Sequence, residues 1–110
     1  PTEVDHIAFL TNLSWSNDAP NGAVVAHVRL HADDGQNFDF ELRAGDHTSE
    51  WAYDRPDIRA RIKHRRAPVA TSYVVEDAHG KYDAHTYVCA FKLPRKAVVT
   101  SGLITAVEGK

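Results

Sequence analysis

The sequence has very little sulfur. Its 110 residues contain no methionine and a single cysteine, Cys89, which excludes an intramolecular disulfide and a cysteine-based zinc site. Long apolar runs are also missing, because none approaches the roughly 20 residues that a membrane-spanning helix needs. We therefore expect no membrane insertion by this chain.

Short motifs for hydrolytic or metal chemistry are absent as well. The chain has no Gly-x-Ser-x-Gly and no His-Glu-x-x-His sequence. Cys89 falls on the inward face of an expected strand, where a thiol is inert. Among the seven histidines, His27 and His31 share a strand face but lie about 13 Å apart, too far to bind one metal ion. The sequence predicts no enzymatic activity. A cupin-like metal-dependent enzyme, whose histidines would converge from several strands, is kept as an alternative.

The charge is unevenly distributed. Residues 55–66 hold six of the thirteen basic residues and one acidic residue, a local net charge of +5 within a chain of net charge −2. This basic run is interpreted as a solvated loop or edge strand, with an acidic partner such as another domain of the parent protein as the alternative. A pI of about 6.4 argues against nucleic acid as a partner.

Alternating apolar and polar residues predict strands along most of the chain. The clearest are 23–31 and 37–44, joined by a turn at Gly35; a second turn is expected at 77–80. Further short strands are expected at 4–10, 69–75, 85–93, 97–100 and 103–107, with Pro94 ending one of them. The pattern predicts an all-β fold: an antiparallel β-sandwich of about eight strands, of jelly-roll or galactose-binding-like type.

We expect one β-sandwich domain spanning residues 1–110, either whole or excised from a longer protein. Residues 45–68 are irregular, and within them 57–66 fit a short helix or a strand equally well. Inward-facing apolar positions predict the core. These residues are Ile7, Phe9, Val24, Val28, Leu30, Phe38, Phe40, Leu42, Val74, Tyr87, Cys89, Phe91 and Ile104.

Trp51 and Tyr53 form the most informative aromatic pair. If the segment is extended, both rings project to the same side, which suits stacking on a sugar ring. The alternative is that Trp51 plugs one end of the sandwich, because tryptophan is usually well buried. Leu13 and Trp15, in the polar stretch before residue 23, are candidate anchors.

Acidic residues offer two weaker possibilities. Asp39 and Glu41 are neighbours on one strand face, but they are interpreted as a solvated face and not as a glycosidase pair. Two acidic turns, Asp33-Asp34 and Asp46 with Glu50, could supply oxygen ligands for a structural calcium ion, although no EF-hand loop is present. No other cofactor is expected.

The stretch LRAGDHTSEWAYDRPDIRARIKHRRAPVATSY (42–73), with IAFLTNLSWS (7–16) and AVVAHVRLHADDGQNFDFELRAG (23–45), resembles the soluble tail domain of large bacterial polytopic membrane proteins of the glycosyltransferase and lipid-linked sugar type. The likeness covers residues 7–93, and the segment after Pro94 is shorter than that pattern requires. The resemblance implies a jelly-roll sandwich similar to carbohydrate-binding modules, an extracytoplasmic (periplasmic or cell-surface) location and no catalytic role. The residues that carry it are Gly45, Asp46, Glu50, Trp51, Tyr53, Asp54, Arg55, His64, Tyr87 and Leu93.

The first hypothesis is therefore a non-catalytic accessory module that binds a glycan or glycolipid head group through residues 45–66. Trp51 and Tyr53 would stack on the sugar. The expected hydrogen-bonding residues are Asp46, Glu50, Asp54, Arg55 and His64. The alternative is a docking or oligomerisation domain of a larger membrane-associated protein, with the basic run as the contact. The oligomeric state is left open.

Overall fold

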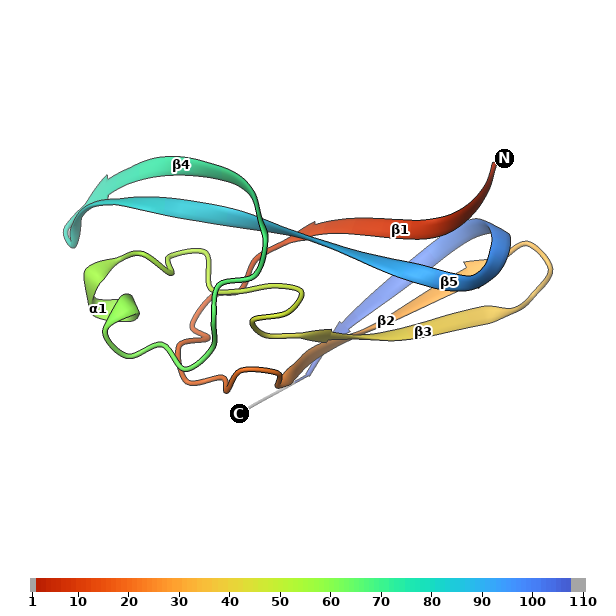
Figure 1. Cartoon of the computed structure of the whole chain (residues 1–110), viewed down its shortest axis with the longest axis horizontal. Helices are drawn as coiled ribbons and strands as arrows, with labels where there is room; N and C mark the ends of the chain where they lie inside the picture. The colour runs from red at the N-terminus through yellow and green to blue at the C-terminus, as the bar shows by residue number, and fades with distance from the viewer. Residues whose placement is uncertain (1, 108–110) are drawn as a thin grey trace.

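The computed structural model describes residues 2–107 as an elongated all-β molecule (Figure 1). Its extents are 50 × 27 × 17 Å and its radius of gyration is 15.7 Å. A compact domain of this length would have a radius of gyration of about 13 Å. The elements are β1 (Glu3–Thr11), β2 (Val24–Ala32), β3 (Asn37–Arg43), α1 (Pro56–Arg59), β4 (Val69–Asp77) and β5 (Gly80–Ala106).

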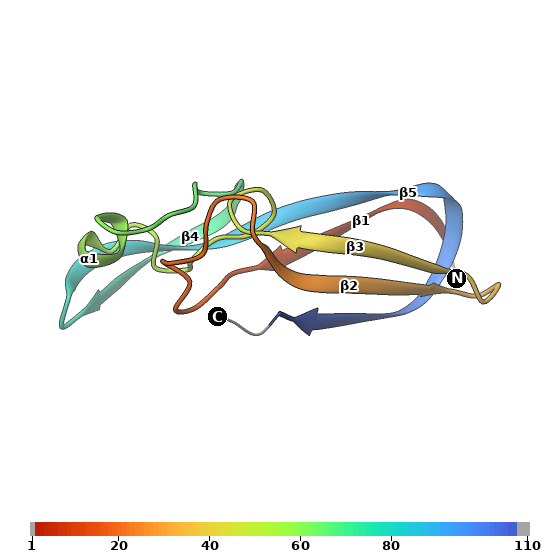
Figure 2. The ribbon, with the colours of Figure 1, turned by 90° about the horizontal axis from the view of Figure 1, so that it is seen from below.

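Strand β5 is central to the strand pairing, because β1, β2 and β4 all pair with it. Its first part pairs with β4, its middle with β1 and its last part with β2, always antiparallel. The change from β1 to β2 occurs between Val98, opposite Glu3, and Val99, opposite Ala32. Figure 2 shows β5 turning over at this end of the molecule, so that its last part joins β2 and β3. Strand β3 completes this layer by pairing with β2.

Within residues 2–107 the structure has five strands and not about eight. The three short strands expected after residue 84 are parts of the single strand β5. The prediction that Pro94 ends a strand is wrong. Lys92 pairs with His6 and Ala97 with Val4, so Pro94 lies in an irregularity where β1 makes no ladder pairing. Proline lacks a backbone N–H and is tolerated in a strand at such a position.

The apolar core lies where β1 and the middle of β5 face β2 and β3. Two buried clusters fill it. They consist of Val28, Leu30, Ala32, Phe38, Leu93 and Ala97, and of Ala26, Leu42, Cys89 and Phe91. Most predicted core residues are buried or pack against these clusters, but Val74 and Ile104 are 59% and 50% exposed. Val74 lies opposite the exposed Asp83, and Ile104 lies in the last part of β5, an edge of its layer.

The irregular segment between β3 and β4, called here the 44–68 loop, lies against the hairpin of β4 and β5 (Figure 1). Of the two structures considered for residues 57–66, the strand is wrong and the helix is limited to the single turn of α1, which buries Ile58. Gly45 has a φ of 86°, and a side chain there would clash with Asn21. The start of this loop therefore requires glycine.

Candidate functional site

Two loops that are distant in sequence are joined by their backbones. Leu13 donates its N–H to the Ser49 carbonyl at 2.9 Å and accepts from the Trp51 N–H at 2.9 Å. Leu13 is thus the backbone anchor between the 12–23 loop and the 44–68 loop. Trp15 is not an anchor, because its side chain is 92% exposed.

Glu50 is buried at this junction, with 2% of its surface exposed. Its Oε1 accepts hydrogen bonds from the Ser16 N–H at 2.8 Å and the Ser16 hydroxyl at 3.0 Å. Its backbone carbonyl accepts from the Tyr87 hydroxyl at 2.8 Å, and burial raises the pKa of Tyr87. The Glu50 carboxylate therefore holds the 12–23 loop in place.

His64 lies behind Glu50 and is also 2% exposed. Its Nδ1 lies 3.1 Å from the Ala19 carbonyl, and its Nε2 lies 3.4 Å from the Glu50 N–H. A neutral ring satisfies both contacts, with Nδ1 donating and Nε2 accepting. Burial lowers the pKa of His64, in agreement with this state. Tyr53 donates its hydroxyl to the His64 carbonyl at 2.9 Å.

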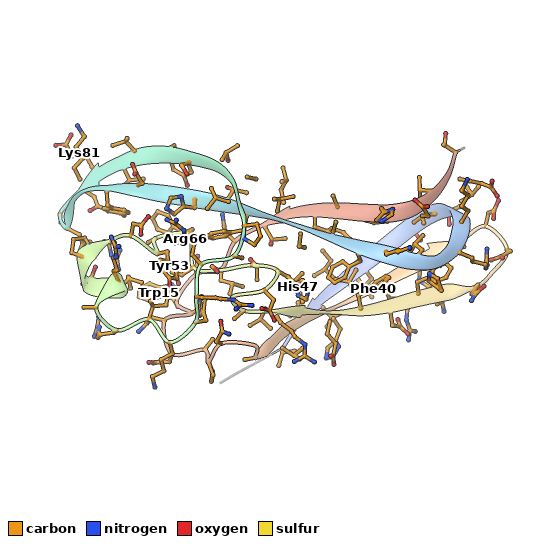
Figure 3. The ribbon with its side chains drawn as sticks, viewed as in Figure 1. Trp15, Phe40, His47, Tyr53, Arg66 and Lys81 are labelled. Carbon is orange, nitrogen blue, oxygen red and sulfur yellow. The ribbon has the colours of Figure 1, made fainter. Side chains whose placement is uncertain are left out.

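A cavity of about 230 Å³ opens where the two loops meet. Trp15 stands beside it with a φ of 59°, a left-handed conformation that is uncommon outside glycine. Trp51 is half-buried, and its ring centroid lies 6.3 Å from that of Tyr82. The lining residues are Ser14, Trp15, Glu50, Trp51, Ala52, Arg55 and Ile58. Figure 3 shows Trp15 and Tyr53 at this end of the molecule, away from Phe40 in the core region.

The structure brings three of the predicted site residues, Glu50, Trp51 and Arg55, to this cavity. Residues 51–54 form a turn, so the alternation that would direct Trp51 and Tyr53 to one side does not apply.

The other predicted residues lie around the cavity without lining it. Tyr53, which is half-buried, contacts the buried His64. Asp46 forms an ion pair with Arg65, and Asp54 binds Arg66 and His85. The seven predicted residues therefore fall into separate groups of contacts.

Sequence reasoning missed Ser14 and Trp15 as site residues. They lie more than thirty residues before Trp51, and they reach the cavity through the Leu13 pairing with Glu50 and the hydrogen bonds of Ser16 to the Glu50 carboxylate. The available signal is a tryptophan inside a polar, turn-rich segment.

The acidic turns proposed for calcium have basic partners. Asp34 pairs with Arg95 and Asp46 with Arg65. The pKa of Asp34 is lowered, first by the hydrogen bond from the Gln36 N–H and then by Arg95. Within residues 2–107, no three His, Cys, Asp or Glu side chains gather as a metal site would require. Calcium binding stays a prediction.

No family model matches the chain, and neither the curated proteins nor the solved structures searched contain a match. Across residues 2–107, none of the helical structure is long and apolar enough to cross a membrane.

Proposed function

We propose that the chain is a non-catalytic accessory module that binds a glycan or glycolipid head group between Trp15 and Trp51. The observation that carries the proposal is Trp15, an indole 92% exposed beside a cavity that Trp51 also lines. Ligand sites are typically concave, with aromatic walls and a few placed polar groups. A free aromatic ring can stack on the C–H face of a sugar.

Arg55 is the polar group best placed to bind such a ligand. It lines the cavity, and its Nε and Nη2 donate to the Asp57 carboxylate at 2.7 and 3.2 Å. This two-point contact fixes the plane of the guanidinium and leaves other N–H groups for a sugar hydroxyl or an anionic substituent. Ser14 adds a hydroxyl. Glu50 acts by positioning the loop of Trp15, because its Oε1 is engaged by Ser16.

We also propose a finer description of the fold. The buried clusters between two strand layers support a sandwich of jelly-roll or galactose-binding-like type. The similarity to bacterial glycosyltransferase-type tail domains and the extracytoplasmic location are proposed on the sequence resemblance alone.

A broad glycan array tests the binding proposal with the wild-type chain, Trp15→Ala and Trp51→Ala. Tyr73→Ala is the matched control, because Tyr73 is a 51% exposed aromatic on β4 outside the cavity lining. We expect a family of related glycans to bind, and Trp15→Ala to lose them without a change in melting temperature. Tyr73→Ala should bind as the wild type does. A silent array, or binding retained in Trp15→Ala, would overturn the proposal.

Docking on a parent domain or a second copy is the second candidate, favoured by the last part of β5. Leu103 and Ile104 are 60% and 50% exposed there, and Val107 beyond it is 44% exposed. The basic run favours docking less, because Arg55, Arg65 and Arg66 pair with acidic residues of their own loop. Sedimentation at low and high salt is the test. Association that persists in salt supports apolar docking, whereas a monomer under both conditions counts against self-association.

A further inference from the structure

Three side chains form a continuous hydrogen-bonded chain across β4, β5 and the 44–68 loop. Ser72 Oγ lies 2.7 Å from His85 Nδ1, and His85 Nε2 lies 2.6 Å from Asp54 Oδ2. His85 is 4% exposed, whereas Ser72 is exposed at the surface. A carboxylate accepts from a protonated Nε2, which leaves the Nδ1 lone pair to accept from the serine hydroxyl.

Contacts on each side hold this arrangement. The His85 backbone N–H donates to the Trp51 carbonyl at 2.9 Å, which ties β5 to the loop that carries Asp54. Arg66 Nη1 lies 3.1 Å from the same Asp54 oxygen that contacts His85. Figure 3 shows Arg66 between the hairpin and the loop. The imidazole therefore has a fixed position between its two partners.

The strand register explains why the two side chains meet. Ser72 lies directly opposite His85, and the His85 N–H points away from β4 toward Trp51. The two residues thus form a non-hydrogen-bonded antiparallel pair, the type in which side chains come closest. Among the described residues β4 pairs only with β5, so the Ser72 N–H points to the open edge of β4. That N–H can donate to an oxygen held beside the serine.

We propose that Ser72 is a nucleophile for acyl transfer from small carboxylic esters, with His85 as its general base and Asp54 as the positioning residue. The Ser72 oxygen bonds to the ester carbonyl carbon while its proton passes to His85 Nδ1. The C–O bond to the leaving alcohol then breaks, and that alkoxide takes the proton from Nδ1. Water, deprotonated by His85, attacks the acyl-serine, and the proton returns to Ser72 as the acid leaves.

The exposure of Ser72 indicates the substrate class. An ester approaches the edge strand from solvent, which favours small, unhindered acyl groups such as acetyl over long chains. The proposal is independent of glycan binding, because neither Ser72 nor His85 lines the cavity of Trp15. Loss of glycan binding would leave this inference standing. Turnover at Ser72 would replace the non-catalytic part of the proposed function and leave glycan binding at Trp15 intact.

A fluorophosphonate probe and p-nitrophenyl acetate test the inference on the full chain, with the modified residue located by mass spectrometry. Ser101 is an internal control, because it also lies opposite a histidine, His31, whose Nδ1 contacts Asn37. We expect the probe on Ser72 and not on Ser101. Ser72→Ala should abolish probe labelling and ester turnover, while Ser101→Ala should leave both unchanged.

Two further variants test the assigned roles. General-base assistance is worth roughly 10²–10⁴-fold, so His85→Gln should slow labelling by about 100-fold or more. Asp54→Asn should also slow it and change the pH dependence of the labelling rate, an effect that a merely structural role would not produce. If either variant fails to fold, the comparison of probe labelling at Ser72 and at Ser101 in the wild-type chain still tests the proposal. Equal labelling of the two serines, or turnover that persists in Ser72→Ala, would overturn the proposal.

Discussion

The two halves of this molecule are stabilised by different interactions. In the packed half, formed by β1, β2, β3 and residues 88–106 of β5, apolar side chains such as Val28 and Leu93 are each 1% exposed. In the polar half, formed by the 44–68 loop and the hairpin of β4 and β5, several buried side chains are polar. These are Thr48, Ser49, Glu50, His64 and His85.

This difference determines which substitutions each half tolerates. Apolar packing is non-directional, so the packed half depends on volume and burial. The polar half depends on each donor meeting its acceptor, and within residues 2–107 no fully buried side-chain nitrogen or oxygen lacks a partner. Both candidate sites lie in or beside the polar half, where directed hydrogen bonds fix polar side chains in defined positions.

Leu93→Ala should give the largest loss of stability. Removing a fully buried leucine side chain leaves a cavity and costs about 2–5 kcal/mol of unfolding free energy. Urea unfolding followed by circular dichroism measures the cost. Leu103→Ala is the matched control, because Leu103 is 60% exposed, and its urea midpoint should barely move. Similar midpoints for both variants would contradict the assignment of the packed half.

Glu50→Ala should have the next largest effect. It leaves the half-buried Ser16 N–H and hydroxyl without their acceptor. A fully buried unsatisfied donor costs about 1–3 kcal/mol, so we expect a loss at or below the lower end of that range. NMR shift changes should be confined to the 12–23 and 44–68 loops, with β2 and β3 unchanged. Glu50→Gln, which keeps one carbonyl oxygen, should be milder. Shift changes spread across β2 and β3 would show that the halves are not separable.

Acid should weaken the polar half through His64. Burial lowers the pKa of His64 in the folded state below its ordinary value of 6.5. The unfolded chain then binds more protons than the folded chain as the pH falls below 6.5. The contribution of neutral His64 to the free energy of unfolding is therefore fully present above that pH and decreases below it. Urea unfolding at pH 7.5 and 5.5 should show the loss. His64→Gln should reduce it and His27→Gln, an exposed control, should not; an unchanged loss in His64→Gln would reject the assignment.

Arg29→Ala should have the smallest effect. Arg29 Nε lies 2.7 Å from Asp39 Oδ1 on the outer face of the packed half, but the two side chains are 53% and 61% exposed. Solvent and salt screen such pairs, so we expect no measurable change in the urea midpoint. A loss comparable to that of Glu50→Ala would show that polar contacts matter in both halves alike.

Sequence reasoning succeeded where structure is local. The alternation in residues 23–31 and 37–44 and the glycine turn between them fix β2 and β3 through neighbouring residues alone. The course of β5 was not predictable in this way. Its path through Pro94 depends on a gap in the pairing with β1, and its change of partner at Val99 depends on packing across the molecule.

The candidate sites follow the same rule. Trp51 and Arg55 are close in sequence and were predicted together, whereas Trp15 reaches them through a distant backbone pairing. Glu50 and His64 have the side chains of ligand-binding residues, but sequence does not reveal that they are buried as structural partners. Counting outward from the turn at 77–80 would have paired Ser72 with His85, so that contact was available and overlooked.

Native-state hydrogen exchange by NMR tests the division into two halves most directly. The amides of Val28 and Phe40, in the packed half, should exchange only through global unfolding. The amides of Ser16 and Trp51, whose acceptors lie at the loop junction, should exchange through a local opening of lower free energy. Equal opening free energies at all four amides would contradict the account, because the molecule would then unfold as a single unit.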